Sequence, residues 1–215
     1  MDQRDDLIAG LSRDLAPVRK APDVNRLALA WFLLGAIFVV VATRLAGPLR
    51  PGVFAQFTAE PRFLLETLLG VAAIAWMSLV AFRGAVPAAL TRRFAIVGAV
   101  LMLLWLAQYV FGLVNPALEP SELGKRGHCS MEVMLYSTPL ILAAMYFIRR
   151  LYPLAFARTA LSAGLAAGMV PALYMQLACM YESVHILSMH IFPGLVMGLA
   201  AAAMALVWRP KNTAA

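Results

Sequence analysis

The sequence predicts an all-α protein: a polytopic bundle of six transmembrane helices, preceded by a short N-terminal cytoplasmic amphipathic helix. Hydrophobic residues make up 62% of the chain, charged residues make up 13%, and the mean hydropathy is +0.79. Soluble domains use roughly 45–50% apolar and about 25% charged residues, so a soluble chain of this length could not bury so much apolar surface. We therefore expect a lipid bilayer to solvate most of the chain.

The apolar residues fall into six runs, each close to the roughly 20 residues that a membrane-spanning helix needs. Gly and Pro residues mark the breaks between the runs. We expect a cytoplasmic segment over residues 1–25, a six-helix transmembrane domain over 26–209 and a cytoplasmic tail over 210–215. The predicted spans are Leu27–Ala46, Phe63–Phe82, Phe94–Val114, Met131–Ile148, Leu154–Ala178 and Ile186–Trp208.

The basic residues predict the orientation of these spans. Thirteen of the eighteen Lys and Arg residues lie in segments on the same side as the N-terminus. Cytoplasmic loops carry such an excess, so both termini are expected in the cytoplasm. The net charge of +7 is spread over short loops rather than gathered in one patch, which argues against direct binding of nucleic acid.

The N-terminal segment is predicted to bind a partner protein. Leu7, Ile8, Leu11 and Leu15 fall within an arc of about 100° on a helix that would end near Pro17. All five aspartates of the chain lie within its first 23 residues, so the polar face leans acidic. An anionic membrane surface would not favour that face, whereas a groove on a partner protein would accept it. So short a helix would become ordered on binding.

Two pairs of glycines and two prolines describe how the last spans pack. Gly164 with Gly168, and Gly194 with Gly198, each form a G-x-x-x-G pattern, which lets helix backbones approach closely. We interpret these pairs as internal packing rather than as a dimerisation face. Pro171 and Pro193 are expected to kink the fifth and sixth spans.

The two cysteines are predicted to lie close together at the outer face. Cys129 precedes the fourth span and Cys179 ends the fifth, and a short inner loop would make these two spans an antiparallel pair. Each cysteine begins a C-x-x-E motif. A helix that persisted past Cys179 would line Cys179, Glu182 and His185 along one stripe. Glu66 is a further neighbour. The candidate ligands of a metal ion are His128, Cys129, Glu132, Cys179, Glu182 and His185.

Residue chemistry leaves three explanations of this cluster open: ordinary polar residues at an interface, a disulfide between Cys129 and Cys179, or a site for a soft or borderline metal ion. The chain lacks a C-x-x-C pair, a Walker loop, a nucleophile elbow and an H-E-x-x-H motif, and the span centres are nearly free of charge. We therefore expect a protein that is not an enzyme. The alternative is a membrane-integral redox or metal-binding enzyme that uses the Cys/His/Glu cluster. The oligomeric state stays open.

The whole chain resembles the NrsF family of anti-sigma factors. The resemblance is carried by the N-terminal pattern from Asp5 to Arg19, by the six spans, by the motif from Gly124 to Glu132, and by the motif from Cys179 to His185. It implies an inner-membrane protein that sequesters an ECF sigma factor and releases it under heavy-metal or oxidative stress. The residues implied to bind the sigma factor are Leu7, Ile8, Leu11, Asp14 and Leu15, and the implied sensor cysteines are Cys129 and Cys179.

Overall fold

The computed structural model describes residues 3–13, 22–151 and 153–208, and within these ranges the chain is helical without any β-strand. In chain order the helices are α1 (Gln3–Arg13), α2 (Val24–Ala46), α3 (Val53–Ala59), α4 (Pro61–Gly84), α5 (Arg92–Phe111), α6 (Cys129–Arg149), α7 (Phe156–Ala178), α8 (Ser183–His185) and α9 (Phe192–Val207). A π-helical segment, η1 (Ile186–Ile191), joins α8 to α9, so that Ser183–Val207 forms one continuous span.

The predicted six-helix architecture is confirmed. Six helices, namely α2, α4, α5, α6, α7 and the span from α8 through α9, are long and apolar enough to cross a membrane. Their ends differ from the predicted ones by a few residues, and the short helix α3 was not predicted. Side chains such as Leu33, Leu34 and Ile37 on α2 are exposed on the outside of the bundle, which is the apolar surface that lipid would cover.

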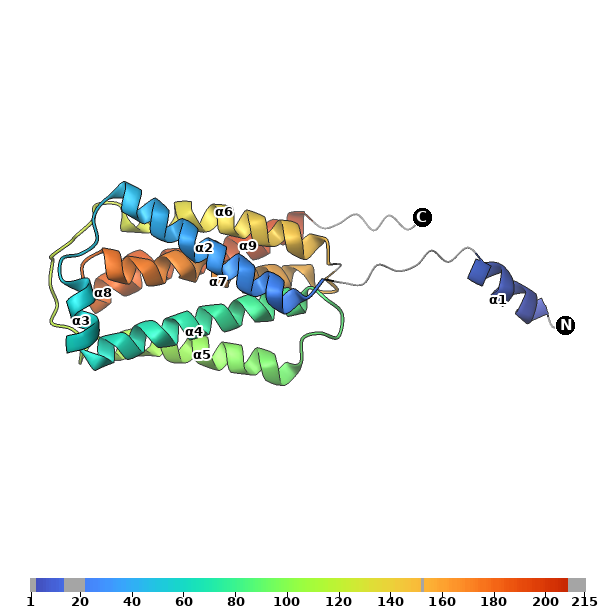
Figure 1. The fold of residues 1–215 in the computed structure, drawn as a ribbon, viewed down its shortest axis with the longest axis horizontal. Helices are drawn as coiled ribbons and strands as arrows, with labels where there is room; N and C mark the ends of the chain where they lie inside the picture. The colour runs from blue at the N-terminus through green and yellow to red at the C-terminus, as the bar shows by residue number, and fades with distance from the viewer. Residues whose placement is uncertain (1–2, 14–21, 152, 209–215) are drawn as a thin grey trace.

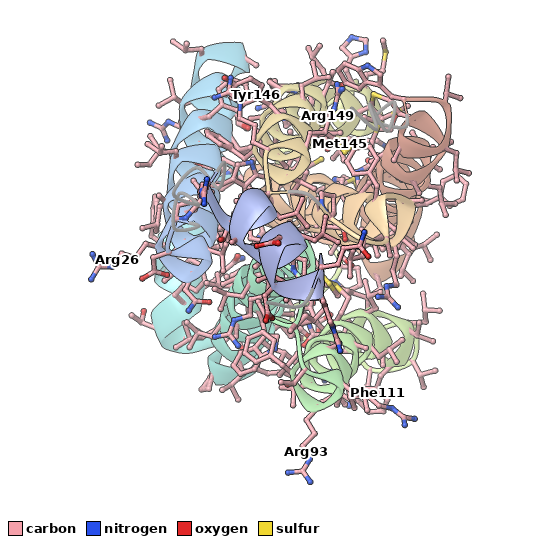
Figure 2. The ribbon with its side chains drawn as sticks, turned by 90° about the vertical axis from the view of Figure 1, so that its right-hand side faces the viewer. Arg26, Arg93, Phe111, Met145, Tyr146 and Arg149 are labelled. Carbon is pink, nitrogen blue, oxygen red and sulfur yellow. The ribbon has the colours of Figure 1, made fainter. Side chains whose placement is uncertain are left out.

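The six long helices run alongside one another, and Figure 1 shows that α2 begins and α9 ends at the same end of the bundle. We call this the terminal end, and we call the opposite end, which holds Cys129 and Cys179, the cysteine end. Figure 2 looks onto the terminal end, where Arg26, Arg93 and Arg149 lie on three different helices. These three are among the basic residues that predicted the orientation, and they lie at one end of the bundle.

Helix α7 lies at the centre of the bundle and packs against α2, α4, α6 and α9. Its closest neighbour is α9, because small residues of the two helices face each other. A Cβ atom built on Gly168 would collide with the carbonyl oxygen of Gly194, and one built on Gly164 would lie 2.5 Å from the Cβ of Ala201. Both G-x-x-x-G pairs therefore serve internal packing, as predicted.

Helix α1 forms part of the predicted amphipathic segment. Within α1 no residue is buried, and Leu7, Ile8 and Leu11 are all exposed. Asp14, Leu15 and Pro17 lie outside the described residues, as does the predicted tail over 210–215. Helix α2 begins at Val24 because the side chain of Asp23 accepts hydrogen bonds from the backbone N–H groups of Asn25 and Arg26.

Candidate metal and thiol centre

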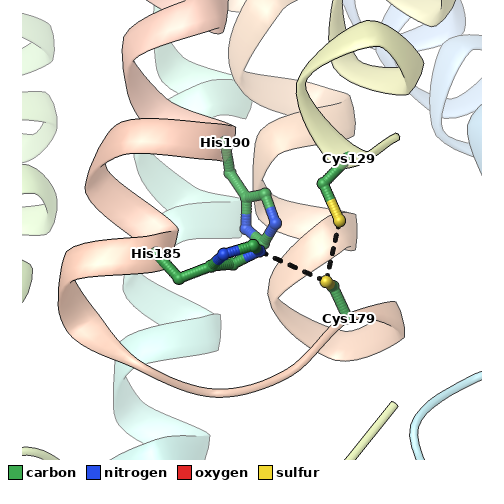
Figure 3. A group of neighbouring side chains, drawn as sticks. All are labelled: Cys129, Cys179, His185 and His190. Atoms are coloured by element: carbon green, nitrogen blue, oxygen red, sulfur yellow. Dashed lines mark hydrogen bonds between the residues drawn. The ribbon is translucent and has the colours of Figure 1, made fainter. Parts of the chain in front are cut away.

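The two cysteines lie side by side at the cysteine end of the bundle. Cys129 is the first residue of α6, and Cys179 directly follows α7. Both residues are buried, both are free thiols, and their Sγ atoms are 2.7 Å apart (Figure 3). Residues 50 positions apart in sequence therefore meet because α6 and α7 form an antiparallel pair.

Three backbone contacts hold the thiols in this position. The N–H of Cys179 donates to the carbonyl of Met175 at 2.8 Å and closes the last turn of α7. The Cys129 thiol donates to the carbonyl of Arg126 at 3.3 Å. Two residues past Cys179, the N–H of Ser121 donates to the carbonyl of Tyr181 at 3.1 Å and ties together the loops before α6 and after α7.

The π-helical segment brings two histidines to the thiols. His185 ends α8 and His190 lies within η1, and on an α-helix at 3.6 residues per turn this spacing of five would set them about 140° apart. In the π-helix the N–H of Phe192 bonds to the carbonyl of Leu187, so residues five apart share a face. The two imidazole rings lie 5.0 Å apart between centroids, and His185 Nε2 is 3.4 Å from Cys179 Sγ.

The proline that follows explains why the helix widens here. Pro193 has no N–H to donate to the carbonyl of Met189, so the ordinary α-helical bond is missing at this point. The helical ladder can therefore shift to a five-residue spacing just before the proline. Pro193 was predicted to kink the span, and it lies just after the π-helical segment that carries His190.

His190 is fully buried, and neither of its ring nitrogens has a hydrogen-bond partner of acceptable geometry among the described residues. A buried polar group without a partner costs about 1–3 kcal/mol, so this imidazole calls for an explanation. The ring still lies close enough to Cys179 to favour its thiolate. The pKa of Cys179 is lowered, first by its contact with Cys129 and then, against the effect of burial, by His190.

Four donor atoms, from Cys129, Cys179, His185 and His190, lie within 4.8 Å of one another. The cluster differs from the set predicted from sequence, because His190 replaces three candidates. His190 was not among the candidates predicted from the sequence, because an α-helix would point it away from His185. The signal that could have identified His190 is the five-residue spacing from His185 to His190 together with Pro193, three residues after His190.

Glu132 was predicted as a ligand, but the structure pairs it with an arginine. The Arg126 guanidinium donates to both carboxylate oxygens of Glu132, at 3.0 and 3.1 Å, and also donates to the carbonyl of Pro48. Arg126 therefore links the loop after α2 to the first turn of α6. Its guanidinium occupies both oxygens of the Glu132 carboxylate, and its backbone carbonyl accepts from the Cys129 thiol.

The remaining predicted neighbours also lie outside the group of four. His128 is exposed, and Glu182 is half-buried in the turn before α8. The stripe of Cys179, Glu182 and His185 required a helix that persisted past Cys179, and it does not form because α7 ends at Ala178 and the backbone of Cys179 is extended. Glu66 accepts a hydrogen bond from the Tyr181 hydroxyl at 2.9 Å and faces Arg62 at 3.7 Å, so it belongs to a separate network.

A buried arginine lies behind this network. The Arg50 guanidinium carbon is 5.6 Å from the ring centroid of Phe63 and 5.7 Å from that of Tyr181. Burial lowers the pKa of Arg50, while a negative charge on Tyr181 or Cys179 would raise it. Gly124 makes this placement possible, because its φ is +78° and a Cβ atom there would lie 2.9 Å from the Arg50 backbone.

This arrangement suits two kinds of chemistry. Two adjacent thiols can be oxidised to a disulfide, and two thiolates with two imidazoles can hold a borderline or soft metal ion. The structure supplies the donor atoms for both outcomes within one buried cluster.

The family model described as "NrsF: Negative regulator of sigma F" matches residues 11–210, which is nearly the whole chain. No curated protein matches the chain, and no solved structure matches it. The match covers all six spans and all four residues of the cluster, and the description is that of a regulator rather than an enzyme. The chain thus belongs to the NrsF family of negative regulators of a sigma factor.

Proposed function

We propose that this protein sequesters an ECF sigma factor at the bacterial inner membrane and releases it when Cys129 and Cys179 respond to heavy-metal or oxidative stress. The family match supports negative regulation of a sigma factor. The ECF type of the partner, the sensing role of the cysteines and the location in the inner membrane belong to the proposal. It assigns no catalytic turnover, because a regulator needs only two states with different affinities for its partner.

The membrane location and orientation are supported by the apolar bundle and by its basic terminal end. In the proposed orientation the terminal end faces the cytoplasm, following the excess of Lys and Arg in its loops. The cysteine end then faces the oxidising periplasm, where thiol chemistry can report on the environment. Labelling of Cys129 and Cys179 in intact cells by a membrane-impermeant thiol reagent, after the cluster is opened with mild denaturant, tests this orientation.

The observation that carries the sigma-factor assignment is the apolar stripe of α1. Leu7, Ile8 and Leu11 are 64%, 57% and 66% exposed, although α1 is too short to be stable by itself in water. Asp5 and Asp6 lie in its first turn beside this stripe. An amphipathic helix with acidic flanks fits an apolar, basic-rimmed groove on a partner protein. In this proposal Asp14 and Leu15 extend the same binding segment.

Substitution of the stripe tests the partner assignment. The double variant Leu7→Asp with Leu11→Asp is expected to abolish co-purification of the sigma factor, because each change places a charge on the binding face. Ala9→Asp is the matched control, because residue 9 lies about 150° around the helix from the centre of the stripe. Unchanged capture by the double variant would refute the assignment, and so would equal loss with Ala9→Asp.

A signal from the thiols must cross the length of the bundle. Helix α7 has 23 residues and is therefore about 35 Å long. The four residues of the cluster belong to the start of α6, the end of α7 and the last span, and the last span packs on α7 through paired glycines. A change at the cluster would therefore shift these three spans relative to one another and alter the terminal end from which the N-terminal segment emerges.

Serine substitutions test the sensing role. Cys129→Ser and Cys179→Ser each remove one thiol from a pair that is already in contact, so each is expected to abolish the stress response. The readout is a reporter gene under control of the sigma factor, measured before and after addition of Cd²⁺ or an oxidant. A double serine variant that responds like the wild type would show that the thiols are not the sensor.

A further inference from the structure

We propose that Cys129, Cys179, His185 and His190 form one four-coordinate site for a divalent cation of the Zn²⁺ and Cd²⁺ class. The inference deepens the proposed function, and it rests on that function only for the regulatory consequence of binding. The site differs from the ligand set expected from sequence by including His190, which the π-helix brings to the thiols. It excludes Glu132, Glu182 and His128.

The donor atoms lie close to the spacing of a tetrahedral site, and one pair already has it. Metal–sulfur bonds of about 2.3 Å and metal–nitrogen bonds of about 2.0–2.1 Å place the ligand atoms of a tetrahedron roughly 3.3–3.8 Å apart. The distance from Cys179 Sγ to His185 Nε2 is 3.4 Å, and all four donors lie within 4.8 Å of one another. The two sulfurs, at 2.7 Å, would separate by about 1 Å to admit an ion.

The donors come from separate elements but converge on a common point. Figure 3 shows Cys129 entering from one helix and Cys179 from the neighbouring chain segment, while His185 and His190 project toward them from the last span. His190 is fully buried, with neither nitrogen satisfied by another described group. One of these nitrogens could coordinate a metal ion and would then no longer lack a partner.

The charge of the site matches a divalent ion. Two thiolates balance the charge of the cation, and two neutral imidazoles add none, so the complex is neutral in a buried setting. Glu132, a carboxylate predicted as a ligand, is held by two hydrogen bonds from Arg126. Two sulfur and two nitrogen donors favour Zn²⁺ or Cd²⁺ over Mg²⁺ or Ca²⁺, which take oxygen ligands. Binding would release the thiol protons that remain on Cys129 and Cys179.

A disulfide alone explains less of the cluster. It requires only Cys129 and Cys179 together with an oxidant that accepts two electrons, and it gives no role to either imidazole. Metal binding uses all four residues and gives a role to both imidazoles, which the π-helical segment holds 5.0 Å apart. In this assignment the ion would join the first turn of α6, the segment after α7 and the last span, and so would favour one packing of these three elements.

The test uses the full-length protein in detergent, fully reduced and metal-free, with Co²⁺ as the spectroscopic probe. We expect one Co²⁺ per chain, with the strong visible bands of a tetrahedral ion and a sulfur-to-cobalt charge-transfer band. Cys179→Ser and His190→Gln should each lose these bands or lower the affinity by at least tenfold. His128→Gln and Glu182→Gln are the matched controls, because both residues are near the cluster in sequence but outside the group of four.

Substitution of the half-exposed His185 provides a variant that should still fold even if the variants at buried positions do not. His185→Gln should weaken Co²⁺ binding while the thermal unfolding of the metal-free protein stays like that of the wild type. Added Cd²⁺ should raise the melting temperature of the wild type and of the two control variants only. Any of three results would overturn the site. The first is an octahedral Co²⁺ spectrum, and the second is wild-type affinity in both single variants, His190→Gln and His185→Gln. The third is loss of binding in His128→Gln.

Capture of the sigma factor, measured on the same preparations without metal, separates the two proposals. Capture without tetrahedral Co²⁺ bands would overturn the metal site and leave the anti-sigma role standing. Tetrahedral bands without any capture would overturn the anti-sigma role and leave the metal site standing.

Discussion

Replacement of Arg126 by methionine should expose the two thiols to reagents. Arg126 donates two hydrogen bonds to Glu132 and one to the carbonyl of Pro48, and its own carbonyl accepts from the Cys129 thiol. The paired side chains are only 10% and 16% exposed, so this ion pair is poorly screened by solvent. Loss of the guanidinium would leave a largely buried carboxylate without its cation beside the first turn of α6.

The size of the effect follows from these contacts. Hydrogen bonds between charged groups contribute about 1.5–3 kcal/mol each when buried, and partial exposure reduces this value. We expect local opening around Cys129 to become about 2 kcal/mol easier. Because 1.36 kcal/mol corresponds to a factor of ten, the population of the open form should rise roughly 30-fold.

Alkylation of the thiols measures this opening. Cys129 and Cys179 are buried, so a maleimide reacts only when the segment opens, and the rate follows the open population when reclosing is fast. Lys125→Met is the matched control, because Lys125 forms a neighbouring ion pair with Glu122 whose side chains are 56% and 79% exposed. An unchanged rate in Arg126→Met, or an equal increase in Lys125→Met, would refute the role of Arg126 in holding the site closed.

Two further substitutions test the packing of the bundle. Gly168→Ala should lower the free energy of unfolding by about 1–3 kcal/mol, because its Cβ would meet the backbone of Gly194. Gly127→Ala is the control, because a Cβ there meets nothing within 4 Å. The melting temperatures of the two variants in detergent measure the difference. Tyr109→Phe should cost about 1–3 kcal/mol by leaving the buried Gln176 amide without the hydroxyl that donates to it. The same change at the exposed Tyr146 should leave the melting temperature unaltered, and equal shifts would contradict this account.

The fold could be predicted from sequence because a bilayer restricts what the chain can do. Each crossing requires a long apolar helix, so the six runs of hydropathy translated directly into six helices. The glycines at 164, 168, 194 and 198 were correctly interpreted as internal packing, because α7 and the last span approach each other closely at these positions. Helix α3 was missed because seven residues carry too little periodicity to distinguish a short helix from a loop.

The site could be predicted only in part. The proximity of Cys129 and Cys179 followed from the antiparallel pairing of two consecutive spans. The predicted stripe failed because α7 ends one residue before Cys179, and no local residue signals that end. His190 was missed because, on an α-helix, a residue five positions after His185 lies on a different face. The hydrogen bond missing at Pro193 lets the helix widen and brings the two histidines to the same face.

Glu132 shows a different limit of sequence reasoning. A carboxylate three residues after a cysteine looks like a ligand when the chain is considered one motif at a time. The nearby Arg126 competes for it, and the structure shows a bidentate ion pair that also reaches the loop after α2. Which of two partners a charged side chain takes depends on three-dimensional geometry that the sequence does not contain.

We propose that thiols at one end of the bundle control a sigma factor held at the other. The most direct measurement is the amount of ECF sigma factor that co-purifies with the full-length protein from bacterial membranes, before and after exposure of the cells to Cd²⁺. We expect capture from unstressed cells, release on exposure, and capture that no longer responds when Cys129 and Cys179 are both serine. Absence of the sigma factor from unstressed preparations, or equal release from the double serine variant, would contradict it.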